Sequence, residues 1–265
     1  MVPIMTASHL NQIQFPPGCT VVVGGTGGVG SAVCKQLVAN GTQVAFTYHQ
    51  NQEKATELLE ELNKENAAAA CFRLDLTNRE SIDPVIEKAR AQFGHIHSCI
   101  FCAGSDISMT YISDLEFAQW KEVIEADANG FFQVTKSLLP HFRKQKGGSL
   151  VLISSVGTTR FPKQDILSVA PKALMEALVQ GIAKEEGRYG TRANTLALGV
   201  IDAGIFTRLK EKEFSSEWVE AARQNTALKR FGTADEVARA ALFLASNESS
   251  YMTGQTLYLD GGFHI

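Results

Sequence analysis

A glycine-rich run near the start of the chain has residue types and spacing that suit phosphate binding. An apolar stretch at 21–23 leads into three spaced glycines and then into a helical pattern. Glycine lets the backbone turn tightly and approach a pyrophosphate with no Cβ in the way, while the following helix offers N–H groups at its positive end. A flexible turn is the simpler interpretation, but the strand–turn–helix context favours a dinucleotide. The residues that would form this cradle are Gly24, Thr26, Gly28, Val29 and Gly30.

The elements that must position this turn alternate between strand-like and helix-like patterns. Apolar runs predict strands at 21–23, 44–47, 69–74, 98–102, 150–153, 194–198 and 256–259. Nearly every position in these runs is apolar, which is typical of parallel strands covered by helices on both faces. The helical pattern that starts at Val29 stops at Asn40-Gly41, a favourable C-cap pair, and Thr233 is the expected N-cap of a later helix.

This alternation predicts one α/β domain over residues 19–265, preceded by an N-terminal extension at 1–18. The expected architecture is a single Rossmann-type, doubly wound parallel sheet with helices on both faces, because strand–helix–strand units wind in one hand.

Composition excludes several classes of function. The net charge of −3 gives no sign of the basic patch that a nucleic acid or an anionic membrane would require. No apolar run reaches the ~18 residues that span a bilayer, and the first nineteen residues do not resemble a signal peptide. Of the five cysteines, Cys99 and Cys102 form a single C-x-x-C pair, but this pair lies inside a continuous apolar run, so we expect reduced thiols, no metal site and a cytoplasmic protein.

The glycine turn has Gly-x-x-x-Gly-x-Gly spacing, wider than the G-x-G-x-x-G fingerprint. Further motifs follow in order along the chain: Asp75-Leu76, Ala103-Gly104, Ser154-Ser155, Lys172, Asn194, Gly199, Ile201, Thr253-Gly254 and Asp260-Gly261-Gly262. From about residue 19 to residue 265, these motifs resemble the short-chain dehydrogenase/reductase family, and overall its 3-oxoacyl-carrier-protein reductases. The resemblance implies that Asp75-Leu76 contacts the adenine, that Ala103-Gly104 ends an Asn-Asn-Ala-Gly motif, and that Ile201 lies near the nicotinamide amide.

The second predicted strand bears on the choice of nicotinamide cofactor. NAD-specific Rossmann enzymes place an acidic residue at its end to bind the ribose 2′-OH. Here Tyr48 and His49 lead into a loop with no carboxylate to repel a 2′-phosphate, and with no arginine to bind one. We therefore expect NADP(H) rather than NAD(H), although these could be ordinary loop residues.

The resemblance also assigns the catalytic positions, and the chain departs from several of them. The family uses an Asn, a Ser and a Tyr-x-x-x-Lys pair, in which tyrosine supplies the proton and lysine binds the nicotinamide ribose. Ser155 and Lys172 match, but Ser168 occupies the tyrosine position and Asp127 the asparagine position. Phe101-Cys102 and Leu198 are further departures.

Ser168 has two interpretations. A serine hydroxyl is a far weaker acid than tyrosine, whose pKa near ~10 a neighbouring lysine can lower. Because Pro171 follows and proline is tolerated in a helix only in its first turn, Ser168 could instead be a helix N-cap.

Asp127 is the first alternative proton donor. Asp127-Ala128-Asn129 resembles motifs of the 2,4-dienoyl-CoA reductases, a branch of this family that also abandons Tyr-x-x-x-Lys, although the match is partial. An aspartate acid needs its pKa raised by ~3 units from ~3.9, which burial among Phe101, Phe131 and Phe132 could achieve. Asp127 could equally be ionised and bonded to Lys172 or a helix end. Tyr111 is a second candidate, with a pocket-rim aromatic as its simpler role.

The resemblance further implies a lid at about 203–230 and a homo-tetramer or dimer, because the pattern at 172–183 is apolar nearly all round. Arg160 and Lys163 could meet a CoA- or carrier-protein-linked substrate at the pocket mouth. The sequence thus predicts a reductase of a carbonyl or conjugated enoyl group in an acyl thioester. The alternatives are a catalytically impaired dinucleotide-binding protein and a non-redox isomerase or dehydratase on the same fold.

Overall fold

Seven parallel strands form one sheet in the computed structural model, which describes residues 13–64 and 68–265. The strand order is β3-β2-β1-β4-β5-β6-β7, and each neighbouring pair is parallel. All seven predicted strands are confirmed, with ends shifted by at most three residues. The strands are β1 (Cys19–Val23), β2 (Gln43–Tyr48), β3 (Ala69–Arg73), β4 (Ile96–Phe101), β5 (Gly148–Ser155), β6 (Thr191–Leu198) and β7 (Thr256–Leu259).

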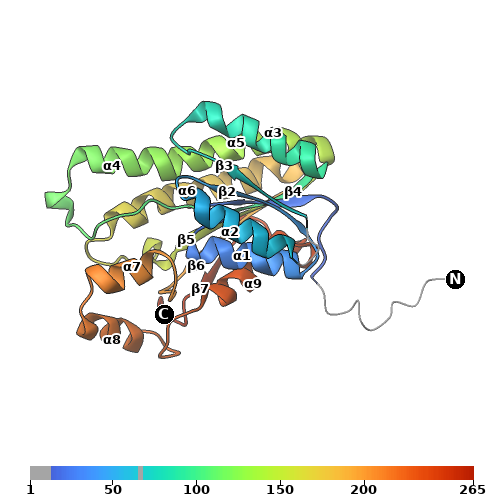
Figure 1. Cartoon of the computed structure of the whole chain (residues 1–265). Helices are drawn as coiled ribbons and strands as arrows, with labels where there is room; N and C mark the ends of the chain where they lie inside the picture. Colours follow the sequence, from blue (N-terminus) through green and yellow to red (C-terminus); the bar gives the residue numbers. More distant parts are fainter. Residues whose placement is uncertain (1–12, 65–67) are drawn as a thin grey trace.

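Helices cover both faces of the sheet, as the uninterrupted apolar strands predicted (Figure 1). One face packs against α1 (Gly28–Ala39), α2 (Gln52–Asn63) and α9 (Ala234–Ala245). The other packs against α3 (Ile82–Phe93), α5 (Gly130–Gln145) and α6 (Ile166–Glu186). In β1, Val22 belongs to the first core and Val21 and Val23 to the second, so one strand contributes to both cores.

The order of the sheet decides where a ligand can bind. Strands run outward from β1 in one direction through β2 and β3, and in the other through β4 to β7. The connections after β1 and β4 therefore diverge at their carboxyl ends and leave a crevice there, the usual ligand position in open α/β sheets. The segments that follow β1, β4, β5 and β6 all meet at this edge.

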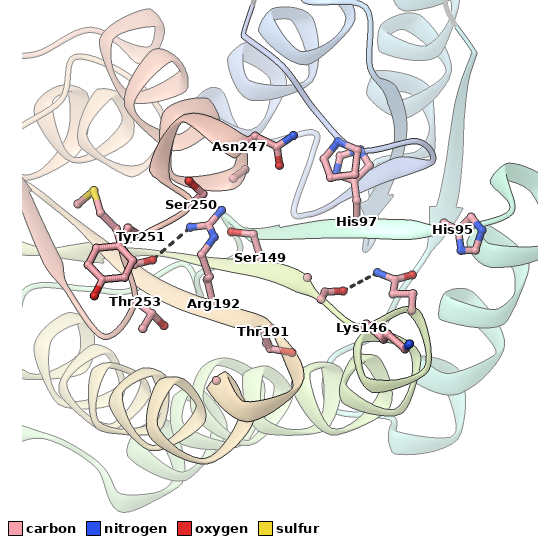
Figure 2. Close-up of a pocket in the computed structure, with 18 of the residues that line it drawn as sticks. His95, His97, Lys146, Ser149, Thr191, Arg192, Asn247, Ser250, Tyr251 and Thr253 are labelled. Atoms are coloured by element: carbon pink, nitrogen blue, oxygen red, sulfur yellow. Dashed lines mark hydrogen bonds between the residues drawn. The ribbon is translucent and has the colours of Figure 1, made fainter.

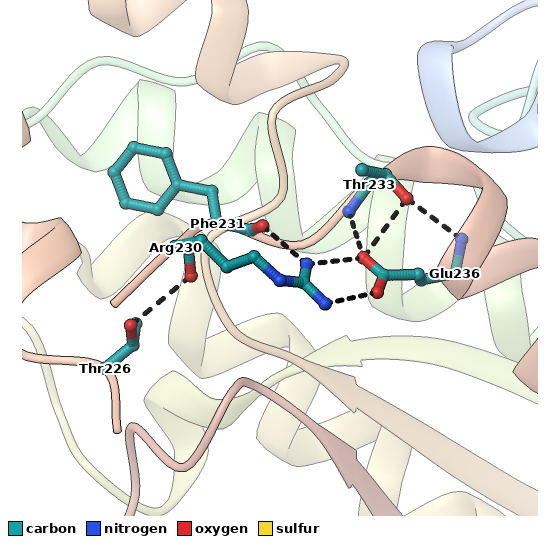
Figure 3. A network of polar contacts seen from close by, with 5 residues as sticks. All are labelled: Thr226, Arg230, Phe231, Thr233 and Glu236. Atoms are coloured by element: carbon teal, nitrogen blue, oxygen red, sulfur yellow. Dashed lines mark hydrogen bonds and ion pairs between the residues drawn. The ribbon is translucent and has the colours of Figure 1, made fainter. Parts of the chain in front are cut away.

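Two short helices, α7 (Ile205–Lys212) and α8 (Ser216–Gln224), fold over this edge within the segment predicted as a lid (Figure 1). A polar network fixes the carboxyl end of that segment (Figure 3). Arg230 donates to both carboxylate oxygens of Glu236, at 2.9 and 2.6 Å. Glu236 also completes a capping box with Thr233, so the predicted N-cap of α9 is confirmed. The lid segment is thereby tied to a core helix.

The remaining helix, α4 (Phe117–Val123), continues through a π-helical turn at Ile124–Asn129 into α5. Within the part of the chain that the structure describes, Ile166–Tyr189 is the one stretch whose length and apolarity alone would allow it to cross a membrane. That stretch contains α6, which packs on β5 and β6 and buries Met175 and Val179, so it acts as a core helix.

Candidate active site

A cavity of about 660 Å³ lies at the carboxyl edge of the sheet, between the phosphate turn and the lid segment. The turn Gly27–Gly30 forms one wall. Cys102 to Gly104 after β4, Ser155 at the end of β5, and the first turns of α6 form the floor. Gly199 and Ile201, which follow β6, also line it.

The glycine turn has the geometry of a phosphate cradle. Gly24 has a φ of +82°, and a Cβ on Gly30 would lie 2.2 Å from the Gly24 carbonyl oxygen. The turn is pinned to β2, because the amides of Gly24 and Gly25 donate to Thr47 at 3.1 and 2.8 Å. Gly27 has no side chain to cap α1, so the first-turn N–H groups point to a ligand position. These residues fit a dinucleotide pyrophosphate.

The loop after β4 packs directly on this turn. A Cβ on Gly24 would meet the backbone of Ala103 at 2.8 Å, so the two segments must stay in close contact. Cys102 lines the cavity, but burial raises its pKa to about 12 and keeps it a neutral thiol.

The expected adenosine corner contains an arginine that the sequence did not reveal. His49 lies 3.8 Å from the carboxylate of Asp75, and Arg73 donates to the His49 carbonyl at 3.3 Å. The pKa of Asp75 is lowered, mainly by the hydrogen bond from Thr77. This arginine does not belong to the loop after β2 but to the end of β3, where the parallel register pairs it with Tyr48. Only the strand register could have located it.

Ser168 and Lys172 lie one helical turn apart on α6, and both line the cavity with Ser155. Lys172 Nζ donates to Ser168 Oγ at 3.2 Å and to its carbonyl at 3.4 Å. Ser155 Oγ accepts from the Gly157 amide at 3.0 Å, which leaves its hydrogen available to a ligand. The structure therefore brings together Ser155, Lys172 and Ser168, the residue at the position of the family's tyrosine.

The alternative interpretation of Ser168 as a helix N-cap is wrong. Asp165 is the N-cap, α6 begins at Ile166, and Ser168 lies in the first turn with its amide bonded to the Asp165 carbonyl at 3.1 Å. Pro171 is consequently in the second turn, deeper than expected. The helix starts early because Leu167 and Val169 are buried in the interior and the Thr110–Asp165 bridge fixes the chain just before them.

Asp127 is buried, at 3% exposure, but it is not among the residues that line the cavity. It lies in the π-helical turn and accepts from both the amide and the hydroxyl of Ser105, at 2.9 and 2.7 Å. Burial raises its pKa, and the Ser105 hydrogen bond and the Lys172 charge oppose that shift. Its position behind Gly104 suits it to hold the loop after β4.

The surroundings of Asp127 and Tyr111, the two proton donors proposed from the sequence, are only partly as predicted. Phe101 and Phe131 are fully buried and pack edge to face at 5.1 Å, whereas Phe132 is 46% exposed. Tyr111 is 52% exposed and does not line the cavity.

A carboxyl group that the sequence analysis missed does line the cavity. Asp165 lies three residues before Ser168, and burial raises its pKa to about 6, against the lowering effect of the Lys172 charge. Within the residues that the structure describes, its side chain makes no capping bond to α6. An aspartate directly before an apolar helical run is a known N-cap signature, so the signal was present but points to a structural role.

The lid side of the cavity is aromatic and aliphatic. Phe214 and Trp218 stack at 3.7 Å, and Met109 and Phe206 line the same wall. Arg208 also lines the cavity, but it is paired with Asp106 at 2.5 Å and donates to the Ile107 carbonyl at 2.6 Å. This wall suits an apolar chain.

Arg160 and Lys163, the positive residues proposed to meet a substrate at the pocket mouth, differ in whether other groups already bind them. Arg160 donates to the Phe263 carbonyl and lies over its ring at 4.5 Å, so it ties the carboxyl terminus to the loop before α6. Lys163 is exposed.

A second cavity, of about 860 Å³, lies at the opposite, amino edge of the sheet (Figure 2). Arg192 lines this cavity. Its guanidinium group donates to the carbonyls of Leu244, Ser246 and Met252 and to Ser249 Oγ. Burial lowers the pKa of His97 to about 4, so it is neutral. Arg192 thus holds the end of α9, and the serine and lysine side chains predicted as catalytic line the first cavity.

Comparisons with known proteins agree with this geometry. Residues 24–264 match the family model described as enoyl-(acyl carrier protein) reductase. A 3-oxoacyl-[acyl-carrier-protein] reductase of Thermotoga maritima is 34% identical, over 86% of this chain and 95% of that protein. A sorbose reductase of Candida albicans is 30% identical, over 98% and 92%.

Solved structures show the same fold. A short-chain type dehydrogenase/reductase from Mycobacterium ulcerans superposes with a TM-score of 0.89 at 27% identity, covering 95% of this chain and 91% of that one. Together with the glycine turn and the Ser155–Lys172 constellation, these matches show that the chain belongs to the short-chain dehydrogenase/reductase family of oxidoreductases and resembles its 3-oxoacyl-carrier-protein reductases.

Proposed function

We propose that the protein is an NADP(H)-dependent reductase of a carbonyl or conjugated enoyl group in an acyl thioester, with a proton donor other than tyrosine. The observation that carries this proposal is one continuous cavity that joins the phosphate cradle to Ser155, Lys172 and an apolar lid wall. The related 3-oxoacyl-[acyl-carrier-protein] reductases support an acyl substrate, and the aromatic wall suits its chain.

Each residue of the site has a defined task in this proposal. When bound, a reduced nicotinamide supplies the hydride. Lys172 reaches the cavity floor, where its ammonium group can bind the nicotinamide ribose. Ser155 can donate its hydroxyl hydrogen to the substrate oxygen, because its lone pairs already accept from Gly157. The stacked aromatic residues of the lid line the same cavity, where they can shield the reacting carbon from water.

The preference for NADP(H) rests on the corner formed by His49 and Arg73. Two basic side chains stand at the end of β2 and β3, close to the expected ribose position. Asp75 belongs to the same corner, but its carboxylate already accepts from Thr77 and faces His49. A planar guanidinium is a strong partner for a phosphate dianion.

The test of this function is NADPH consumption by the purified protein with 3-oxoacyl, 2-enoyl and 2,4-dienoyl thioesters, with NADPH binding titrated in parallel. We expect consumption with at least one thioester, and a loss of about 100-fold or more in Ser155→Ala. NADPH binding without consumption of any thioester would contradict the reductase proposal.

The second candidate function is dinucleotide binding without redox turnover. Ser168 at the position of the family's tyrosine favours it, because the usual acid is missing. The same titration separates the candidates, since this one predicts tight NADPH binding with no turnover.

A further inference from the structure

The side chain of Asp165 is a carboxyl group that its own helix does not use. An aspartate at an N-cap normally accepts from amides in the first helical turn. Here the Ser168 amide, which such a side chain would cap, donates instead to the backbone carbonyl of Asp165 at 3.1 Å, and the side chain makes no capping bond. The Thr110–Asp165 bridge fixes the backbone at this point. The carboxyl group is therefore left at the cavity wall.

The surroundings of Asp165 favour its protonated form more than those of an ordinary surface aspartate. Burial raises its pKa to about 6, and the Lys172 ammonium opposes this effect without cancelling it. At pH 7 a group with such a pKa is about one-tenth protonated, compared with about one-thousandth for an unperturbed aspartate. Asp165 can therefore donate a proton near neutral pH and recover it from water.

We propose that Asp165 is the general acid of this site and protonates the substrate oxygen in place of the missing tyrosine. The inference rests on the proposed reductase function. In carbonyl reduction the carbonyl carbon would accept a hydride from a reduced nicotinamide, whose C–H bond breaks, so that the nicotinamide is oxidised while the C=O π bond breaks and the carbonyl is reduced. The oxygen then takes the proton of the Asp165 carboxyl group, whose O–H bond breaks. The resulting carboxylate regains a proton from solvent, so atoms and charges balance.

The other side chains near the floor of the cavity fit this role less well. Asp127 does not line the cavity, and its Oδ1 accepts both hydrogen bonds from Ser105. Ser168 lines the cavity, but its hydroxyl is a much weaker acid and accepts from Lys172. Asp165 combines access to the cavity with an uncommitted carboxyl group.

The test is the pH profile of kcat/KM for NADPH-dependent reduction in the wild type and in Asp165→Asn. The acid must be protonated, so we expect wild-type kcat/KM to fall as pH rises through about 6. In Asp165→Asn we expect kcat to drop about 100-fold or more and this alkaline limb to disappear. Adding Ser168→Tyr to that variant should restore part of the rate, because tyrosine beside Lys172 can donate the proton.

Asp127→Asn is the matched control, since it removes another carboxylate near Lys172. It should keep the alkaline limb, whatever its effect on the rate. A limb that persists in Asp165→Asn and disappears in Asp127→Asn would overturn the assignment while leaving the reductase function standing. A wild type that reduces none of the thioesters would instead overturn the function itself.

A readout without cofactor or substrate completes the test. Difference infrared spectra of the wild type against Asp165→Asn should show a carboxyl group that titrates near pH 6. A titration near pH 4, as in an ordinary surface aspartate, would contradict the proposed role.

Discussion

At the scale of single residues, Asp165 should destabilise the folded protein at neutral pH. Its pKa is raised from 3.8 to about 6 in the fold, so the folded state binds the proton more tightly than the unfolded state does. The favourable contribution of this group to stability is therefore fully present below pH 3.8, where both states are protonated, and is lost as pH rises through 6 and the buried carboxyl group ionises. We predict that Asp165→Asn is more stable than the wild type by about 1–3 kcal/mol at pH 7.5 and nearly equal to it at pH 4. Urea unfolding at the two pH values measures this difference. Equal stability at both would argue against a desolvated carboxyl group.

Arg73 is the residue on which cofactor choice should depend. It is exposed at the end of β3 beside His49, so its removal should not disturb the core. We predict that Arg73→Ala raises the Kd for NADPH by about tenfold or more and leaves the Kd for NADH within about twofold. Arg79→Ala, which removes another exposed arginine after β3, is the control and should change neither value. Equal weakening of both cofactors in Arg73→Ala would count against a 2′-phosphate site.

At the scale of elements, the start of α9 fixes the carboxyl end of the lid segment. The Thr233 side chain accepts from the Glu236 amide, and Glu236 in turn bonds the Thr233 amide and Arg230 (Figure 3). The Arg230 hydrogen bond lowers the pKa of Glu236 to about 2, so the carboxylate stays charged across the working range of pH.

We predict that Thr233→Ala lowers the free energy of unfolding by about 1 kcal/mol, because α9 loses its capping oxygen. The loss should be measurable by urea unfolding. Thr233→Ser keeps the oxygen and should remain within about 0.5 kcal/mol of the wild type. If the serine variant lost as much stability as the alanine variant, the capping bond would not be the cause.

At the scale of the whole molecule, α6 presents apolar side chains on its outer face as well as its inner one. Met175 and Val179 face the core, while Leu174 is 43% exposed beside the exposed Ala173 and Ala177. We propose that a second copy of the chain covers this outer face, as the sequence led us to expect. Multi-angle light scattering should then show a dimer or tetramer, and Leu174→Glu should shift it towards a smaller species. A monomeric wild type would refute this proposal.

Several features of the fold could be predicted residue by residue from local pattern. Continuous apolar runs such as Val21 to Val23 located the strands, because a strand covered on both faces must be apolar throughout. Thr233 and Asn40 marked a helix start and a helix end through side-chain and backbone chemistry that acts within a few residues. Gly24, Gly28 and Gly30 located the phosphate turn because close backbone approach there leaves no room for a Cβ.

The residues with chemical roles were predicted less completely. Ser155, Ser168 and Lys172 were found because the resemblance fixes their spacing, and the cavity does bring them together. Asp127 was found by the same spacing, yet the π-helical turn carries it behind Gly104 to Ser105. Asp165 and Arg73 were missed, because an N-cap aspartate and a strand-end arginine look structural when read along the chain.

The sequence by itself determined the family, the strands and helices, the phosphate turn and the loss of the tyrosine, since each depends on residues close together in the chain. Only the tertiary structure decided which charged groups share a site. The parallel pairing of β2 with β3 brings Arg73 to His49, and the start of α6 at Ile166 leaves the carboxyl group of its N-cap, Asp165, at the cavity wall. Burial, which sets the pKa of that group, depends on segments distant in sequence that pack around it, and local spacing carries no record of them.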